Sequence, residues 1–158
     1  MELRIFYSTF IVLLLMIMSI FGCAYMKGKI VVSPGTDRRE DIMLEPAQRD
    51  QLLKEMRQLL QGVHGILTGL SGQEIDAQKV EESGRSVGMK MASDSDPAIM
   101  GKLPDLFKEM GVSVHRDFDE LADAAKRGES EKQIMARLVS ITSRCTTCHE
   151  IYRLTAKQ

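Results

Sequence analysis

The sequence of 158 residues predicts an all-α fold, namely an antiparallel up-down-up-down four-helix bundle. Composition is the first indication, because tryptophan is absent, 5% of the residues are aromatic and 27% are charged. The chain also has four prolines and few β-branched runs, which leaves little material for a sheet. Finally, four segments carry apolar residues spaced by threes and fours, which is the spacing of one helix face.

The amino-terminal end is predicted to lie outside this fold. A short polar start, residues 1–4, precedes an almost wholly apolar run, residues 5–20, which leads to Gly22-Cys23. This order is typical of a secretory signal peptide. An uncleaved membrane anchor is an alternative, although about 16 apolar residues are slightly short for a span. A plain secretory signal with a stray cysteine is a third. All three place the remaining chain outside the cytoplasm.

The end of the apolar run resembles the signal of bacterial lipoproteins. Ile20-Phe21-Gly22-Cys23 stands where the lipobox stands, although Phe21 replaces the small or aliphatic residue that is usual there. The resemblance implies that Cys23 is lipidated and becomes the first residue of the mature protein. We therefore expect a signal peptide at 1–22, a lipid-anchored tether at 23–44 and the helical domain at 45–158.

The first two helices are predicted from apolar residues that share one helix face and from residues typical of a helix start. The first runs from Pro46, a favoured first-turn residue, to Leu70. Its apolar stripe consists of Leu52, Met56, Leu59, Val63, Ile66 and Leu70. The second is expected at about 74–93, with a thin stripe that includes Gly84 and is flanked by Gly88. These glycines either allow another group to approach closely or only weaken the helix, at about 1 kcal/mol each.

A loop at 94–103 separates these helices from the third and fourth. The third is expected from Pro104 to Gly128, a natural helix stop. The fourth begins with Ser130 and Gln133 at capping-box spacing and is expected to run to about Ala156. Its apolar stripe consists of Ile134, Leu138, Ile141, Cys145, Cys148 and Tyr152. Because the connections are short, successive helices should be antiparallel neighbours.

The most informative feature of the chain is the motif Cys145-x-x-Cys148-His149. It is typical of a covalent attachment site for c-type haem. Two thiols add across the two vinyl groups of the porphyrin, and the neighbouring imidazole coordinates the iron. On a helix the three residues stand at i, i+3 and i+4, so their side chains leave one face. Since both cysteines continue the apolar stripe, the haem is expected inside the bundle.

Two other kinds of site could use a pair of cysteines at this spacing. A thioredoxin-type redox dithiol should follow a βαβ pattern, and no such pattern precedes it here. A closed zinc site needs four ligands, and beyond the motif only Cys23, His64 and His115 remain, all far apart in sequence. Haem attachment is therefore the favoured interpretation.

Residues 46–157 resemble the class II c-type cytochromes, which comprise the cytochrome c-prime group and its methionine-ligated relatives. The resemblance depends on a haem motif near the carboxyl end, its position in the last of four helices, and the pair Tyr152-Arg153 after it. It implies that Arg153 lies close to the haem, as a basic residue does in this family. The alternative is an ordinary solvated cation at a helix end.

The resemblance also implies that the first helix supplies the residue on the distal side of the haem. High-spin members place an apolar residue there, low-spin members place methionine, and Met56 stands at the matching position. Helix geometry agrees, because His149 lies about 12 Å from the end of its helix and Met56 about 15 Å from the start of its own. His64 is about 12 Å too deep, and His115 flanks its stripe. Met56 is the preferred sixth ligand over a vacant position or either histidine.

These observations predict a membrane-tethered periplasmic cytochrome that carries one covalent haem c and transfers single electrons. Methionine opposite histidine raises the reduction potential, which suits a reversible carrier. The sequence contains no catalytic carboxylate pair, Ser-His arrangement or phosphate loop, so the chain is not expected to be an enzyme. Its formal net charge of −1 gives no case for nucleic acid. Redox proteins are the expected partners, and a homodimer is possible. The alternatives are a five-coordinate binder of nitric oxide or carbon monoxide, and a haem-dependent enzyme or sensor subunit.

Overall fold

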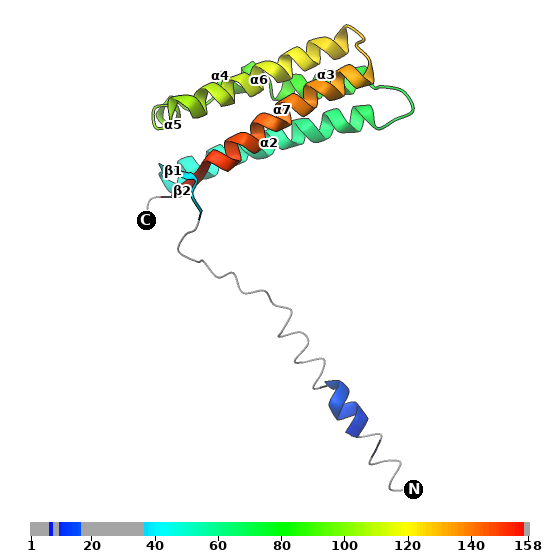
Figure 1. Cartoon of the computed structure of the whole chain (residues 1–158), viewed down its shortest axis with the longest axis vertical. Coiled ribbons are helices and arrows are strands. Elements are labelled where there is room, and N and C mark those ends of the chain that lie inside the picture. The colour runs from blue at the N-terminus through cyan, green and yellow to red at the C-terminus, as the bar shows by residue number, and fades with distance from the viewer. Residues whose placement is uncertain (1–6, 8–9, 17–36, 157–158) are drawn as a thin grey trace. The chain divides into compact units, whose positions relative to one another are not determined.

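The computed structural model describes residues 7, 10–16 and 37–156 (Figure 1). The chain divides into an amino-terminal unit, residues 1–36, and a carboxyl-terminal unit, residues 37–158. In the amino-terminal unit residues 10–16 are helical. The predicted cleavage point and the predicted lipidation site, Cys23, lie outside the described residues. Across the described part of the chain, no helix combines the length and the apolar character that a membrane crossing requires.

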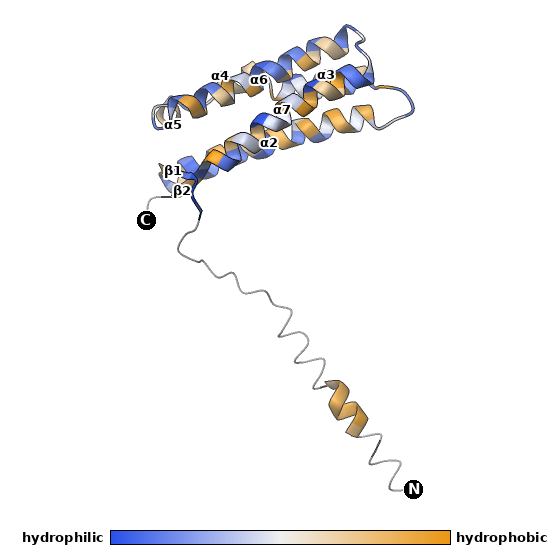
Figure 2. Ribbon diagram, in the orientation of Figure 1, coloured by the Kyte–Doolittle hydropathy of each residue, from blue (hydrophilic) through white to orange (hydrophobic). Residues whose placement is uncertain are grey.

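The carboxyl-terminal unit is mostly helical, which confirms the helical character predicted from composition and apolar spacing, and it adds a small sheet that was not expected. Its elements in chain order are β1 (Glu40–Leu44), α2 (Pro46–Leu70), α3 (Ala77–Ser86), α4 (Met89–Ser93), α5 (Pro97–Met100), α6 (Asp105–Lys126), α7 (Glu131–Ile151) and β2 (Tyr152–Ala156). Figure 2 shows apolar and polar residues alternating around the long helices, as amphipathic helices require.

The starts of the long helices follow the cap signals in the sequence. Proline occupies the first turn of α2, where its missing N–H costs nothing, and this helix has the predicted bounds. The predicted capping box of α7 is present, with Ser130 and Gln133 bonded reciprocally. After α6, Gly128 takes a positive φ of 74°, a conformation that glycine adopts without strain.

The second predicted helix is not continuous, and this prediction was wrong. Helices α3 and α4 are separated at Val87 and Gly88. The carboxylate of Asp119, on α6, accepts a hydrogen bond from the backbone N–H of Met89 at 2.8 Å and so caps the start of α4. A side chain at position 88 would collide with that carboxylate. The predicted loop at 94–103 is also not fully irregular, because it contains the short helix α5.

The end of the fourth predicted helix was wrong as well. Helix α7 ends at Ile151, and the next five residues form β2, which pairs in parallel with β1. Strand β1 occupies 40–44, which were predicted to belong to the tether. The strands form because Ile42, Leu44 and Tyr152 bury their side chains, whereas a helix continued past Ile151 would leave the apolar face of β1 uncovered.

Close backbone packing joins α2 to α3, α3 to α6, α4 to α6 and α6 to α7, whereas α2 and α7 are not among the closely packed pairs. The approach of α2 to α3 depends on three glycines of α2, because a Cβ at any of them would collide with a side chain of α3 or of Val87, which follows α3. These glycines are Gly62, Gly65 and Gly69. Helix α2 therefore has two inward faces, one of glycine toward α3 and one of larger apolar residues.

Buried apolar residues form two separate cores. The first core joins α2, α3, α6 and α7 and consists of Ile66, Leu70, Val80, Val87, Val114, Phe118, Leu121, Ala124, Ala125, Ile134, Leu138 and Ile141. The second core joins the sheet to α2, α5, α6 and the turn between α5 and α6, and it consists of Ile42, Leu44, Leu52, Ile99, Leu103, Phe107 and Tyr152. The rings of Phe107 and Tyr152 meet edge to face, with centroids 5.5 Å apart.

Candidate functional site

The Cys-x-x-Cys-His motif lies in the last two turns of α7. Both cysteines are free thiols and half-buried. The thiol of Cys145 donates to the carbonyl of Ile141 at 3.5 Å, and Cys148 packs against the second core. Burial raises the pKa of both thiols above the ordinary value of 9.0, so both are protonated at neutral pH. Cys148 is therefore directed toward the second core, whereas Cys145 is half-buried and belongs to neither core.

His149, the third residue of the motif, is exposed in the last turn of α7. Its imidazole makes no hydrogen bond or ion pair with any residue that the structure describes. Its backbone carbonyl accepts a hydrogen bond from Nη1 of Arg39 at 3.2 Å. The side chain is thus free to act as a ligand, while the backbone beneath it is fixed.

Met56 lies on α2 and is half-buried. It packs against the second core, as Cys148 does from α7. One turn later on α2, Leu59 packs against the first core instead. The structure therefore brings Met56 and Cys148 to the same apolar cluster, although they are far apart in the sequence, and Met56 lies near the boundary of the two cores.

Gly111 marks the same boundary on α6. It stands on the stripe between Phe107 of the second core and Val114 of the first, at i+4 and i−3. A Cβ at this position would have no heavy atom within 4 Å, apart from its own helix backbone and chain neighbours. Open space therefore lies beside α6 at a position where the rest of the stripe is filled.

The other two histidines lie elsewhere. His64 is exposed on α2. His115 is half-buried on α6, and its Nδ1 forms a 2.7 Å hydrogen bond with the carbonyl of Val87 at the junction of α3 and α4.

Arg153 does not lie one turn further along α7, because that helix has ended and Arg153 belongs to β2. Its guanidinium forms a two-bond ion pair with Asp41, its partner across the sheet, and a longer bond of 3.5 Å with Asp37. The structure thus gives this side chain two carboxylate partners on the chain that leads into the domain.

Glycines 84 and 88 are explained by their contacts with α6. A Cβ at Gly84 would lie 2.9 Å from the carbonyl oxygen of Phe118, and one at Gly88 would collide with Asp119. Of the alternatives left open by the sequence, close approach of a neighbouring element is therefore the one that the structure supports.

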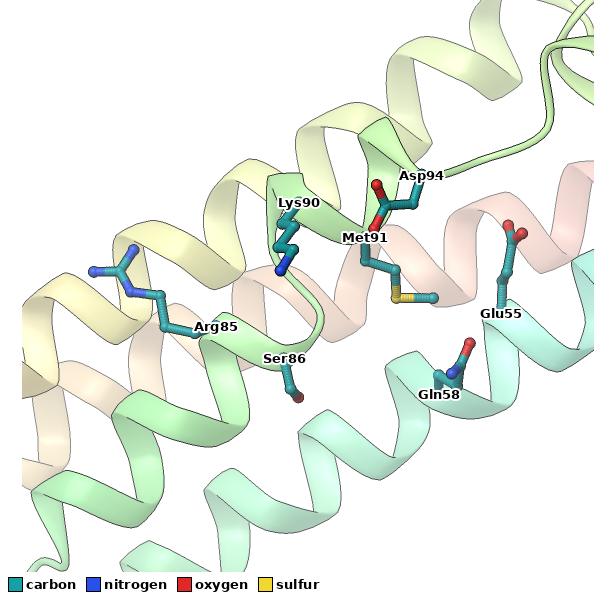
Figure 3. A pocket seen from close by; sticks show the side chains of 7 residues that line it. All are labelled: Glu55, Gln58, Arg85, Ser86, Lys90, Met91 and Asp94. Carbon is teal, nitrogen blue, oxygen red and sulfur yellow. The ribbon is translucent and has the colours of Figure 1, made fainter.

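A pocket of about 560 Å³ lies between α2 and the α3–α4 pair (Figure 3). Its lining residues are Glu55, Gln58, Arg85, Ser86, Lys90, Met91 and Asp94. Glu55 flanks Met56 in sequence, but the residues of the Cys-x-x-Cys-His motif do not line this pocket. Within the described part of the chain, no three His, Cys, Asp or Glu residues are grouped closely enough to hold a metal ion, which gives no support to the zinc alternative.

Sequence reasoning missed two residues near the motif. Arg39 belongs to the charged run 37–41, which resembles a solvated linker until the pairing of β1 with β2 is known. Gly111 is a single helical glycine whose surroundings only the fold reveals. No family model matches the chain, and no curated protein or solved structure is significantly similar to it. Function must therefore be inferred from the motif and its surroundings.

Proposed function

We propose that this protein is a monohaem c-type cytochrome of the class II type, which transfers single electrons on the periplasmic side of a bacterial membrane. The observation that carries the proposal is the Cys145-x-x-Cys148-His149 motif at the end of α7, with two half-buried thiols on the face that continues the apolar stripe. Thiols at i and i+3 followed by an imidazole at i+4 are the donor set that covalent haem attachment requires.

The residues around the motif fit this group. The two thiols would form the thioether links, and the free imidazole of His149 would coordinate the iron. Met56 packs on the same core as Cys148, so its thioether is a suitable sixth ligand. The open space beside Gly111 and the absence of close backbone packing between α2 and α7 both favour room for a macrocycle. In this proposal α2, α3, α6 and α7 form a four-helix bundle that encloses the haem.

Bound haem c supplies the one-electron chemistry, and the chain controls it through ligands and burial. His149 and Met56 favour the ferrous state more than two histidines would, because the thioether raises the potential. The apolar residues of the second core exclude water from one side of the site, which lowers the local dielectric. These properties support electron transfer in preference to catalysis, and redox proteins are the expected partners.

An optical and denaturation experiment tests the proposal. Full-length protein made with the haem-attachment machinery should carry one haem that survives denaturation and acid extraction, and Cys148→Ser should retain one thioether at most. Met56→Ala should abolish the weak charge-transfer band of methionine ligation, lower the potential and admit carbon monoxide. His64→Ala and His115→Ala are the matched controls and should leave the spectrum nearly unchanged.

Three outcomes would contradict this proposal at different points. Release of free haem from denatured wild type would exclude covalent attachment. A high-spin spectrum of the wild type would favour the five-coordinate, gas-binding alternative. A spectrum altered by His115→Ala and unaffected by Met56→Ala would favour a carrier with two histidine ligands.

The anchoring part of the proposal rests on the lipobox-like segment alone. Cys23→Ser should abolish labelling with a lipid precursor and release the protein from the membrane fraction. Several acyl chains on one residue give stable anchoring, because each buried methylene contributes about 0.8 kcal/mol. An intact Met1 at the amino terminus of the mature protein would exclude cleavage and lipidation at Cys23.

A further inference from the structure

The last backbone carbonyls of α7 need hydrogen-bond donors from outside the helix. The last carbonyls of a helix have no partner within the helix. The carbonyl of Cys148 accepts from the N–H of Tyr152, but β2 begins there, so the carbonyl of His149 has no helical donor. Arg39 supplies that donor through Nη1, at 3.2 Å, from a position 110 residues earlier in the chain.

Arg39 is itself held in a fixed orientation. Its guanidinium makes a two-bond ion pair with Asp37, with Nε–Oδ1 at 3.0 Å and Nη2–Oδ2 at 2.6 Å. Asp37 also accepts from Arg153, and Arg153 is paired with Asp41 across the sheet. The four charged side chains therefore connect the chain before β1 to the strand that follows α7.

We propose that Arg39 is a positioning residue, which fixes the His149 backbone at the end of α7 and thereby the direction of the imidazole. The inference rests on the proposed haem function. A carbonyl bonded to an oriented guanidinium restrains the peptide after His149. The cation also lies at the negative end of the helix dipole, where positive charge is favourable. Asp37, Arg153 and Asp41 orient Arg39 and do not touch the imidazole.

The small contribution of exposed ion pairs to stability determines which effects the loss of Arg39 should have. Arg39, Asp37 and Asp41 are exposed, and exposed pairs contribute little to global stability. The four charges also sum to zero. Removal of Arg39 should therefore change the local backbone and the local charge much more than the unfolding temperature. The uncompensated negative charge should stabilise the oxidised iron and lower the reduction potential.

Arg38 provides a matched control. It is exposed, carries the same charge at the preceding position, and forms no hydrogen bond or ion pair with any described residue. Arg38→Ala and Arg39→Ala remove the same formal charge, but only the second removes the bond to the His149 carbonyl. A difference in amide exchange between the two variants therefore reports the contacts of Arg39, namely the bond to the His149 carbonyl and the pair with Asp37, and not the net charge.

The experiment compares full-length wild type, Arg38→Ala, Arg39→Ala and Arg39→Lys. Backbone amide exchange is measured at Ile151 and Tyr152, and the reduction potential is measured on haem-loaded protein. In Arg39→Ala, exchange should be at least about tenfold faster than in Arg38→Ala, which corresponds to about 1.4 kcal/mol, and the potential should be lower. Arg39→Lys should lie between wild type and Arg39→Ala in exchange, because lysine keeps the charge but lacks the planar fork.

Equal exchange and equal potential in Arg38→Ala and Arg39→Ala would overturn the inference. If Arg39→Ala does not fold, the lysine variant decides, and wild-type exchange in that variant would overturn the inference as well. A wild type that carries no covalent haem would refute the proposed function instead. Amide exchange would still show in that case whether Arg39 fixes the end of α7, so the two failures can be distinguished.

Discussion

The first core and the second core are formed by different kinds of secondary-structure element. The first is formed by four helices, and three of its largest residues, Ile66, Phe118 and Ile141, are fully buried. The second is formed by two short strands, α5 and parts of longer helices, and the sulfur-containing side chains of Met56, Met100 and Cys148 at its edge are half-buried. Half-buried methionines, Met91 and Met135, also border the first core, so the two cores differ in the elements that form them and not in having such an edge.

The two cores also differ in how their elements approach one another. Glycines of α2 and α3 bring α2 to α3 and α3 to α6, so these helices approach one another closely around the first core. At the second core α2 and α7 are not among the closely packed helix pairs, and a Cβ at Gly111 of α6 would meet no heavy atom within 4 Å outside its own helix backbone and chain neighbours. The chain is therefore packed more closely around the first core than beside Gly111.

The largest expected effect is the loss of a buried aromatic ring from the first core. Phe118→Ala should lower the free energy of unfolding by about 3–5 kcal/mol, because the ring is fully buried and a cavity would remain. Chemical denaturation followed by circular dichroism measures the change. Leu106→Ala, on the same helix at 50% exposure, is the control and should change stability by less than about 0.5 kcal/mol. Equal costs would show that the first core is not the stabilising one.

A pair of glycine substitutions compares the closed and the open surroundings directly. Gly84→Ala should destabilise by about 1–3 kcal/mol, because the new Cβ meets a backbone oxygen that cannot move away. Gly111→Ala should instead stabilise by about 0.4–1 kcal/mol, because alanine restricts the unfolded chain and finds free space in the folded one. Thermal unfolding of both variants measures the difference, and effects of the same sign would contradict it.

A larger residue at the open position sharpens the comparison. Gly111→Leu should leave the helical fold intact, as judged by circular dichroism, but reduce the yield of covalent haem well below that of Gly111→Ala. The physical reason is that a leucine side chain would occupy the space proposed for the macrocycle. Wild-type haem yield in Gly111→Leu would show that the space beside α6 is not used.

The sequence predicted the parts of the fold that depend on local signals. Apolar spacing located the long helices, and the caps at Pro46 and Ser130 gave their starts to within a residue. The predictions that were wrong depend on contacts between residues that are far apart in the sequence. The interruption at Gly88 depends on Asp119, and the end of α7 depends on the pairing of Tyr152 with Glu40. A single sequence contains no signal for either contact.

The candidate site could be predicted to a similar extent. Cys145, Cys148 and His149 form a contiguous motif whose spacing already implies one helix face. Met56 was implied by the family resemblance, with which helix rise agreed, and its role as a ligand stays a prediction. Arg39 and Gly111 could not be found in this way. The contact of Arg39 with His149 spans 110 residues, and the open surroundings of Gly111 depend on how α6 packs against the rest of the fold.

The smallest expected effect concerns how the stability of the fold depends on pH near the second core. The Arg153 guanidinium bonded to Asp41 holds the pKa of that carboxyl below its ordinary value of 3.8. A carboxyl whose pKa is lower in the folded than in the unfolded state stabilises the fold above the unfolded pKa, and this contribution is lost as pH falls through the folded pKa. Wild type should therefore lose a small part of its stability between about pH 5 and pH 2 through this pair.

Asp41→Asn should remove that component, so its unfolding temperature should fall less than that of wild type over the same pH interval. The effect should be small and should shrink with added salt, because the pair is exposed and screened. Asp94→Asn is the control, since Asp94 is exposed and forms no ion pair with any described residue. The unfolding temperature of this variant should depend on pH as that of the wild type does. If Asp41→Asn also matched the wild type at low salt, the pairing of β1 with β2 would owe nothing to this ion pair, and burial of Ile42, Leu44 and Tyr152 alone would hold the sheet together.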